Sequence, residues 1–159
     1  MKIVIVSDTH RDLDVLTEII ETNRGADLFI HLGDGEDEYE DVRYMCPESA
    51  FIYIKGNNDW GMYPPNNIIS LCGHRIYMCH GHSFSRSDLK GYLAATASVN
   101  GCDIALYGHT HVMADDVING IRLINPGSPS CPRGQNPCSY GIMYLSDNGD
   151  VKFEHKIID

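Results

Sequence analysis

Side chains that can bind a metal ion follow directly after apolar runs at several places in this 159-residue chain. In residues 3–10, IVIVSDTH, four β-forming residues lead into Asp8 and His10. A buried strand would therefore deliver a carboxylate and an imidazole, two residues apart, at its carboxyl end. Burying a polar group without a partner costs roughly 2–7 kcal/mol. Because a bound cation removes that cost, this stretch indicates a metal site.

Four further segments repeat the arrangement. Apolar runs lead into Gly33-Asp34, GNND at 56–59, HGH at 80–82 and GHTH at 108–111. The carboxyl ends of neighbouring strands meet at one edge of a sheet, so these segments can converge. The side chains expected to gather there are Asp8, His10, Asp34, Asn57, His80, His109 and His111. They are too many for one ion and suit two divalent metals about 3.5–4 Å apart.

Hydrophobic periodicity predicts the elements that position these side chains. The expected strands are 3–6, 27–32, 51–55, 68–72, 75–79, 103–107, 115–118, 121–125, 140–145 and 151–158. Helices are expected at 12–21, from 36 onwards, and at 85–100, with Asp12 capping the first and Ser85 or Ser87 the last. Strand-helix-strand units followed by hairpins predict two mixed sheets packed face to face, with helices outside. We expect one domain spanning residues 1–159.

Composition narrows the class of protein. The hydrophobic share of 43% is typical of a globular chain, and no apolar run approaches the ~20 residues of a membrane span. The formal net charge of −10 disfavours a nucleic-acid surface, which needs basic residues. The first residues lack an extended apolar signal region, which predicts a cytoplasmic protein with six reduced, mostly buried cysteines. The number of subunits stays open, and a homo-oligomer is compatible with the sequence.

The motifs SDTH, GD, GNND, HGH and GHTH, in this order, resemble the calcineurin-like metallophosphoesterase superfamily. Small size, the GNND form and the stretch NPGSPSCPRG at 125–134 further resemble the YfcE-type phosphodiesterases. The resemblance implies an α/β, four-layer αββα sandwich of two mixed β-sheets flanked by helices. It also implies metal-dependent hydrolysis of a small phosphodiester by two divalent ions. Mn²⁺ is the first choice, with Ni²⁺, Co²⁺, Fe²⁺, Zn²⁺ and Mg²⁺ as alternatives.

The same resemblance assigns roles to residues. One metal would take Asp8, His10 and His111, and the other would take Asn57, His80 and His109, with Asp34 bridging them. A hydroxide bound by both metals would attack phosphorus in line while the ions hold the phosphoryl oxygens. The residues expected to take part in catalysis are Asp34, Asn57, His80 and His82.

One position departs from the pattern of the wider superfamily. Many relatives carry GNH where this chain has Asn58, and that histidine is the proton donor expected in them. Asn58 has no titrating proton, so the leaving group must be protonated by His82 or by water. We therefore expect a preference for activated diesters and weak activity on monoesters. Arg11, Asn58 and Arg133 are the candidates for substrate contact.

Residues near these motifs have competing interpretations. Asp59 either orients a metal ligand or caps a turn. Trp60 and Tyr63 could stack on an aromatic leaving group, but packing against the core is favoured. For Arg11 and Arg133, a solvated side chain is the favoured alternative to phosphate contact.

The remaining polar residues are expected to have ordinary structural roles. His31 is interpreted as an interior, hydrogen-bonded histidine rather than as support for the site. His74 and His155 are placed on the surface. The acidic run at 36–41 is interpreted as a solvated helix start, with a negative rim around the site as the alternative.

Two other functions remain open. The resemblance extends to the small vacuolar-sorting subunit of retromer, a protein-binding scaffold with a degraded metal site. Such a scaffold should lack histidine ligands, whereas His10, His80, His109 and His111 are all present. A nuclease is disfavoured by the acidic balance of the chain.

Overall fold

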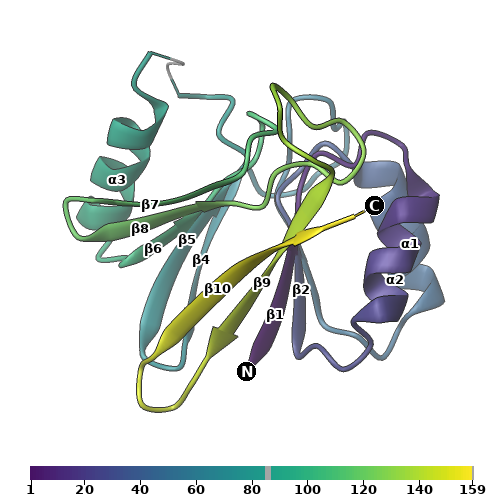
Figure 1. The fold of residues 1–159 in the computed structure, drawn as a ribbon, viewed down its shortest axis with the longest axis horizontal. Coiled ribbons are helices and arrows are strands. Elements are labelled where there is room, and N and C mark those ends of the chain that lie inside the picture. Colours follow the sequence, from purple (N-terminus) through teal and green to yellow (C-terminus); the bar gives the residue numbers. More distant parts are fainter. Residues whose placement is uncertain (85–86, 159) are drawn as a thin grey trace.

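The computed structural model describes residues 1–84 and 87–158 and contains two five-stranded mixed sheets (Figure 1). The first sheet has the order β10-β9-β1-β2-β3. Its strands are β1 (Lys2–Val6), β2 (Leu28–His31), β3 (Phe51–Tyr53), β9 (Ser139–Leu145) and β10 (Val151–Ile157). The second sheet has the order β4-β5-β6-β8-β7. Its strands are β4 (Asn66–Leu71), β5 (His74–Cys79), β6 (Ile104–Leu106), β7 (Ala114–Ile118) and β8 (Ile121–Asn125).

Helices cover the outer face of each sheet (Figure 1). They are α1 (Leu13–Thr22), α2 (Glu36–Met45) and α3 (Leu89–Val99). Leu16 and Ile20 of α1 and Val42 of α2 pack against Val4, Val6 and Phe29 of the first sheet. Leu93 and Ala97 of α3 pack against Tyr77 and Ala105 of the second sheet. The predicted αββα sandwich is therefore confirmed.

The two sheets face each other across a wholly apolar core. Alternation along each strand supplies it, because residues two apart point to the same face. Ile3 and Ile5 of β1 thus meet Ile76 and Met78 of β5 and Leu106 of β6 in one cluster, and all five are essentially inaccessible to solvent. This cluster fixes how the two sheets lie relative to each other.

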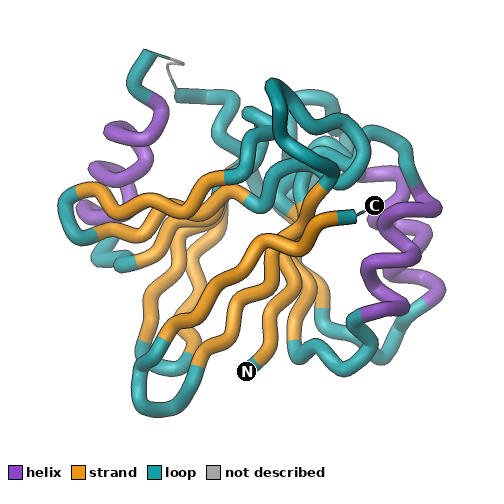
Figure 2. The backbone as a smooth tube through the Cα atoms, in the orientation of Figure 1, coloured by secondary structure: helices purple, strands orange, loops and turns teal. Residues whose placement is uncertain are grey.

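Strand register brings the chemically important loops to one edge. β1 pairs in parallel with β2, placing Val6 opposite His31, so both strands end at the same level. β5 and β6 are also parallel, with Met78 opposite Leu106. The loops after β1, β2, β5 and β6 therefore leave both sheets on the same side (Figure 2).

Helix starts agree with the sequence expectations in part. Asp12 caps α1 as predicted, its Oδ1 accepting a hydrogen bond from the backbone N–H of Val15 at 3.0 Å. α3 begins at Leu89 with Asp88 in the N-cap position, so the proposed cap Ser87 lies outside it. Ser85, the other proposed cap, lies outside the described residues.

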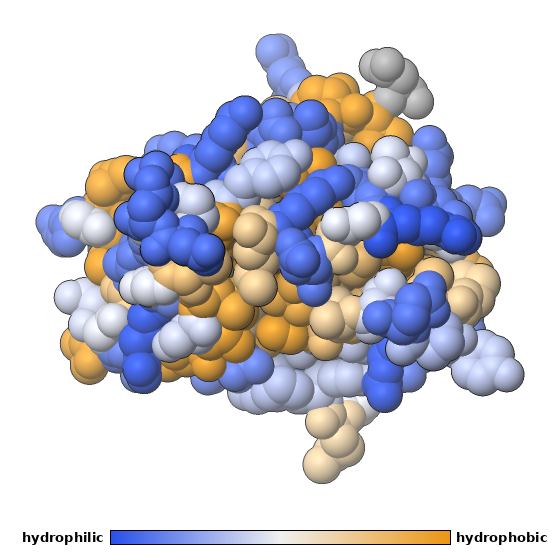
Figure 3. All heavy atoms as spheres, turned by 90° about the horizontal axis from the view of Figure 1, so that it is seen from below, coloured by the Kyte–Doolittle hydropathy of each residue, from blue (hydrophilic) through white to orange (hydrophobic). Residues whose placement is uncertain are grey.

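Two histidines outside the candidate site correct expectations made from the sequence. His74 and His155 are half-buried rather than surface residues. The ring of His74 bonds Asp103 through Nδ1 at 2.5 Å and the carbonyl oxygen of Gly149 through Nε2 at 2.9 Å. Nε2 of His155 donates to the carbonyl oxygen of Asn125 at 2.8 Å. Both histidines thereby link one sheet to the other. Seen from below, the surface of the molecule mixes hydrophilic and hydrophobic side chains (Figure 3).

Within the described part of the chain, no helix is long and apolar enough to cross a membrane.

Candidate metal centre

The loops that carry the predicted ligands have an unusual backbone. Five ligand candidates have φ values between 46° and 63°, in the left-handed region that residues with a Cβ seldom adopt. These residues are Asp8, His10, Asp34, His109 and His111. Such strain persists only where surrounding contacts enforce it, and it concentrates at functional sites.

Asp8 lies at the centre of the cluster and is fully buried. Its Oδ2 accepts hydrogen bonds from Ser7 Oγ at 2.7 Å and from the backbone N–H of His109 at 3.0 Å. Its Oδ1 has no hydrogen-bond partner among the described residues. The Nε2 atoms of His111, His80 and His10 lie 3.2, 3.8 and 3.9 Å from this oxygen. A buried carboxylate oxygen surrounded by three imidazole nitrogens fits a cation.

Asp34 lies beside Asp8 in the same cluster. Its Oδ2 is 3.5 Å from His80 Nε2 and 3.9 Å from His10 Nε2. Asn57 Oδ1 is 3.2 Å from His80 Nε2, and the ring centroids of His109 and His80 are 5.2 Å apart. All seven predicted ligands therefore surround one place, although their division between ions remains a proposal.

Two groups of side chains have the spacing of a metal site. Asp8, His10 and His111 form one group, and Asp8, Asp34 and His80 form the other, with ligand atoms within 4.8 Å of one another. Asp8 belongs to both groups. The geometry thus makes Asp8 as well placed as Asp34 to lie between two ions.

Hydrogen bonds orient two of the imidazoles towards the cluster. Nδ1 of His80 donates to the carbonyl oxygen of Leu32 at 2.7 Å, and Nδ1 of His111 donates to the carbonyl oxygen of Cys131 at 2.6 Å. A neutral imidazole that donates from Nδ1 presents its lone pair at Nε2, the form that binds metals.

Electrostatics within the cluster couples carboxylates to imidazoles. Burial by itself would raise the pKa of Asp34, but the hydrogen bond and charge of His80, with the donors of Asn58, lower it well below its usual range. Burial opposes the charged form of His80, yet Asp34 and Asp8 raise its pKa overall. Protons and a cation therefore compete for the same nitrogen.

Asp59 holds the loop of Asp34 in place, which supports the orienting interpretation made from the sequence. Its Oδ2 accepts from the backbone N–H groups of Asp34 at 3.0 Å and Gly56 at 2.6 Å, and from Tyr53 Oη at 2.8 Å. Its Oδ1 accepts from the backbone N–H of Gly35 at 3.2 Å. The loops that carry Asp34 and Gly56 approach so closely that a Cβ on Gly56 would clash with Asp34 Oδ1.

Glu38 was missed by the sequence interpretation, which treated the acidic run as solvated. Its side chain is 2% exposed and accepts from the hydroxyl of Thr9 at 2.5 Å and the backbone N–H of Arg11 at 2.8 Å. Glu38 therefore steadies the loop on either side of His10.

His31 is an interior histidine, as expected, and its Nε2 forms a hydrogen bond with Thr9 Oγ1 at 3.0 Å. Desolvation lowers its pKa to about 4.

The end of β8 and the Pro- and Ser-rich loop after it form hydrogen bonds to the backbone of the ligand segments. The spacing of motifs in the sequence did not indicate these contacts. The hydroxyl of Ser128 donates to the carbonyl oxygen of Asp8 at 2.7 Å, and that of Ser130 donates to the carbonyl oxygen of Thr9 at 2.7 Å. Nδ2 of Asn125 donates to the carbonyl oxygen of Gly108 at 2.9 Å. This loop therefore holds the first and last ligand segments together.

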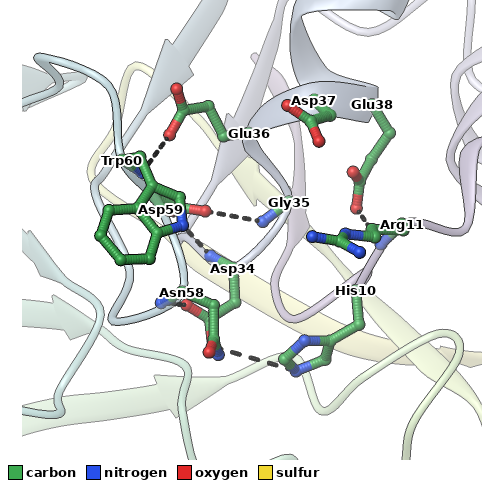
Figure 4. A pocket seen from close by; sticks show the side chains of 10 residues that line it. All are labelled: His10, Arg11, Asp34, Gly35, Glu36, Asp37, Glu38, Asn58, Asp59 and Trp60. Carbon is green, nitrogen blue, oxygen red and sulfur yellow. Dashed lines mark hydrogen bonds and ion pairs between the residues drawn. The ribbon is translucent and has the colours of Figure 1, made fainter.

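A cavity of about 270 Å³ opens beside the cluster (Figure 4). Arg11, Asn58 and Trp60 line it together with His10 and Asp34. The side-chain amide of Asn58 donates to Asp34 Oδ2 at 2.6 Å, so part of this residue acts on Asp34. Trp60 is 91% exposed, which contradicts the expectation that it packs into the core.

Tyr63, by contrast, packs as expected. Its ring centroid lies 4.7 Å from that of Tyr53 and 5.7 Å from that of Tyr39. The two aromatic residues of this loop therefore have different environments.

A second cavity, of about 220 Å³, is lined by His109 and Arg133. His82 is exposed, and its ring centroid is 5.5 Å from that of His80 and 6.3 Å from that of His109. The candidates for substrate contact thus flank the cluster, with Arg11 and Arg133 on different cavities.

Comparison with known proteins gives the family. Residues 1–148 match the calcineurin-like phosphoesterase superfamily domain, and the chain belongs to this family. It is 31% identical to YsnB of Bacillus subtilis, named a probable metallophosphoesterase, over 96% of this chain and 90% of that protein. It is 28% identical to the phosphodiesterase YfcE of Escherichia coli, over 90% and 87%.

Solved structures agree on the fold. The chain matches the E. coli phosphoesterase YfcE with a TM-score of 0.70 at 23% identity, covering all of both chains. It matches Vps29 of Entamoeba histolytica, solved with zinc, with a TM-score of 0.75 at 21% identity, covering 99% of each. The fold is thus shared by a phosphoesterase and by a vacuolar protein sorting protein.

Proposed function

We propose that this protein is a metal-dependent phosphodiesterase with two divalent cations, Mn²⁺ being the first choice. The observation that carries the proposal is the unpartnered, buried Oδ1 of Asp8 among three imidazole nitrogens. Asp8, His10, Asp34, Asn57, His80, His109 and His111 would hold the cations. When bound, such ions supply an activated water and neutralise charge on the phosphoryl oxygens.

The surrounding residues have roles that follow from their positions. Asp59 and Ser128 hold the backbone on both sides of the cluster, so the ligands need little rearrangement to bind ions. Arg11 and Arg133 can bind the phosphoryl oxygens or the ester groups of a small phosphodiester from the two flanking cavities. Asn58 keeps Asp34 in position through its amide.

His82 is the proposed source of the leaving-group proton. Partial burial, followed by the charge of His80, lowers the pKa of His82. Little of this residue is therefore protonated and able to donate a proton at neutral pH. Esters with acidic leaving groups need little protonation, so activated diesters should react well and alkyl diesters poorly.

The test is turnover of bis(4-nitrophenyl) phosphate by protein loaded with Mn²⁺. We expect hydrolysis by the wild type, and no measurable hydrolysis by Asp34→Asn or His80→Ala, because each removes a ligand. Asp147→Asn, in the exposed β9–β10 turn, is the matched control and should keep full activity. Wild-type protein that is inactive with Mn²⁺, Ni²⁺, Co²⁺ and Mg²⁺ alike would overturn the proposal.

A protein-binding scaffold is the second candidate, because Vps29 proteins share the fold. Since one of them was solved with zinc, metal binding alone does not separate the two functions. Turnover does, and a scaffold would bind ions yet leave the diester intact.

A further inference from the structure

The loop that follows the GNND motif leaves a large aromatic side chain in solvent. Trp60 is 91% exposed although full burial of such a ring is favourable. Tyr63, three residues later, packs against Tyr53 and Tyr39 and anchors the loop. The exposure of Trp60 is therefore not the result of a loop that lacks contacts with the fold.

The backbone of Trp60 is fixed from the neighbouring helix. Oε2 of Glu36, the first residue of α2, accepts hydrogen bonds from the N–H groups of Trp60 at 2.7 Å and Gly61 at 2.8 Å. Nζ of Lys55 donates to the carbonyl oxygen of Gly61 at 2.8 Å. A Cβ at position 61 would displace the carboxylate of Glu36, so the absence of a side chain there lets Glu36 reach both N–H groups. Three hydrogen bonds thus fix the backbone that carries the exposed indole.

That place is the wall of the cavity beside the metal centre. Trp60 lines it with Asp34, Asn58 and His10, and Figure 4 shows Arg11 on the side away from the indole. Glu36 and Asp37 line the same cavity and add negative charge. A second phosphate on the substrate would meet these carboxylates, whereas an uncharged planar group can lie against the exposed indole without that repulsion.

We propose that Trp60 is a specificity-determining residue that stacks on a planar, uncharged aromatic group of the ester. The inference rests on the proposed function for the position of the phosphorus atom near Asp34. Aryl groups and nucleobases share the required chemistry, because both present a flat π-face. The loop then selects among diesters that the metal centre alone would treat alike.

Binding can be measured without turnover. Benzyl(methyl)phosphinate and cyclohexylmethyl(methyl)phosphinate, called here the phenyl and cyclohexyl ligands, contain no ester bond and cannot be hydrolysed. They carry the same single negative charge and differ in the aromaticity of the ring. Trp60 is the single tryptophan of the chain, so its fluorescence reports contact directly. With Mn²⁺-loaded wild type we expect the phenyl ligand to quench this fluorescence and to bind more tightly by calorimetry than the cyclohexyl ligand. Adenosine 5′-methylphosphonate, compared with the phenyl ligand, distinguishes a nucleobase from a simple aryl group.

Substitutions at position 60 isolate the contribution of the ring. Trp60→Ala should weaken binding of the phenyl ligand by roughly 5- to 100-fold, as expected for loss of a stacking contact, and change cyclohexyl binding less than about twofold. Trp60→Phe should retain most of the preference. Met62→Ala is the matched control, because Met62 is fully exposed in the same loop and does not line the cavity.

An equal loss for both ligands in Trp60→Ala, or an unchanged preference, would overturn the inference. So would calorimetric binding of the phenyl ligand without any change in fluorescence. A protein that binds the phenyl ligand through Trp60 but hydrolyses no diester would instead contradict the proposed function and leave this inference standing.

Discussion

Five ligand candidates hold left-handed backbone conformations, and this strain has a measurable consequence at single residues. Each such residue costs of order 1–3 kcal/mol, which the surrounding hydrogen bonds must offset. The backbone N–H of Asp8 donates to Gly33 at 2.9 Å, and that of His10 donates to Asp34 at 3.0 Å. The ligand loops therefore stabilise one another by pairing backbone to backbone.

His10 offers a direct test of this strain. In most positions glycine is less stable than alanine by about 0.5–1 kcal/mol. At His10, with φ of 46°, we expect the order to reverse, so that His10→Gly unfolds with a free energy about 1 kcal/mol higher than His10→Ala. Urea unfolding of both variants in the presence of a chelator measures the difference. The usual order, with alanine more stable, would show that the site is not strained there.

The proposed metal ligands carry a local signal in the sequence, whereas the residues that hold them do not. Each ligand candidate follows an apolar run at a strand end, which is a local signal. Glu38 and Ser128 act across 29 and 120 positions respectively, on Thr9 and on the carbonyl oxygen of Asp8, and no local pattern marks such contacts. Trp60 was placed wrongly because tryptophan is a residue type typical of cores, whereas the geometry of its loop keeps this side chain in solvent.

At the scale of elements, His74 connects the start of β5 to both sheets. It faces two acceptors, the carboxylate of Asp103 and the carbonyl oxygen of Gly149 in the β9–β10 turn. An imidazole donates from both nitrogens only when it is protonated. The hydrogen bond to Asp103, opposed by partial desolvation, accordingly raises the pKa of His74.

The pH dependence of stability follows from that direction. The pKa of His74 in the folded protein is raised above the unfolded value of about 6.5. The contribution of His74 to the free energy of unfolding is therefore fully present below pH 6.5 and is lost as pH rises through the folded pKa. Asp103 is half exposed, so we expect only about 0.5–1 kcal/mol. The measurement is the difference in unfolding free energy between wild type and His74→Asn from pH 6 to 9, with chelator throughout. Taking this difference cancels the contributions of His80 and His111, whose raised pKa values also make stability fall as pH rises. A difference that does not shrink with rising pH contradicts the assignment.

Most elements were predictable from periodicity, and their ends were not. The hairpin at Asn119-Gly120 joins β7 to β8 as expected, because both residues adopt the positive φ that this turn requires. The strand expected at 51–55 ends at Tyr53. The backbone N–H of Ile54 still donates to His31 of β2, but that of Lys55 donates to the carbonyl oxygen of Pro64 instead. Such tertiary bonds override local preference.

Over the whole molecule, the candidate ligands divide between the two layers. Asp8, His10 and Asp34 follow strands of the first sheet, and His80, His109 and His111 follow strands of the second. A metal ion should therefore slow hydrogen exchange in loops of both sheets at once. We expect Mn²⁺ to increase protection at 7–12 and at 108–112 together, measured by mass spectrometry, with His111→Ala reducing both effects. Protection confined to one sheet would mean that ions do not bridge the layers.

The contacts between the layers also restrict how the protein can move. At one edge the backbone N–H of His109 is bonded to Asp8, and at the other His74 is bonded to Gly149. With the sheets joined at both edges and an apolar core between them, hinge opening of one sheet against the other is disfavoured. In the proposed enzyme, substrate would enter and product would leave past the segments at the rim, those around Trp60 and Arg133. Turnover should accordingly respond to changes in loop length there more than to changes in the sheets.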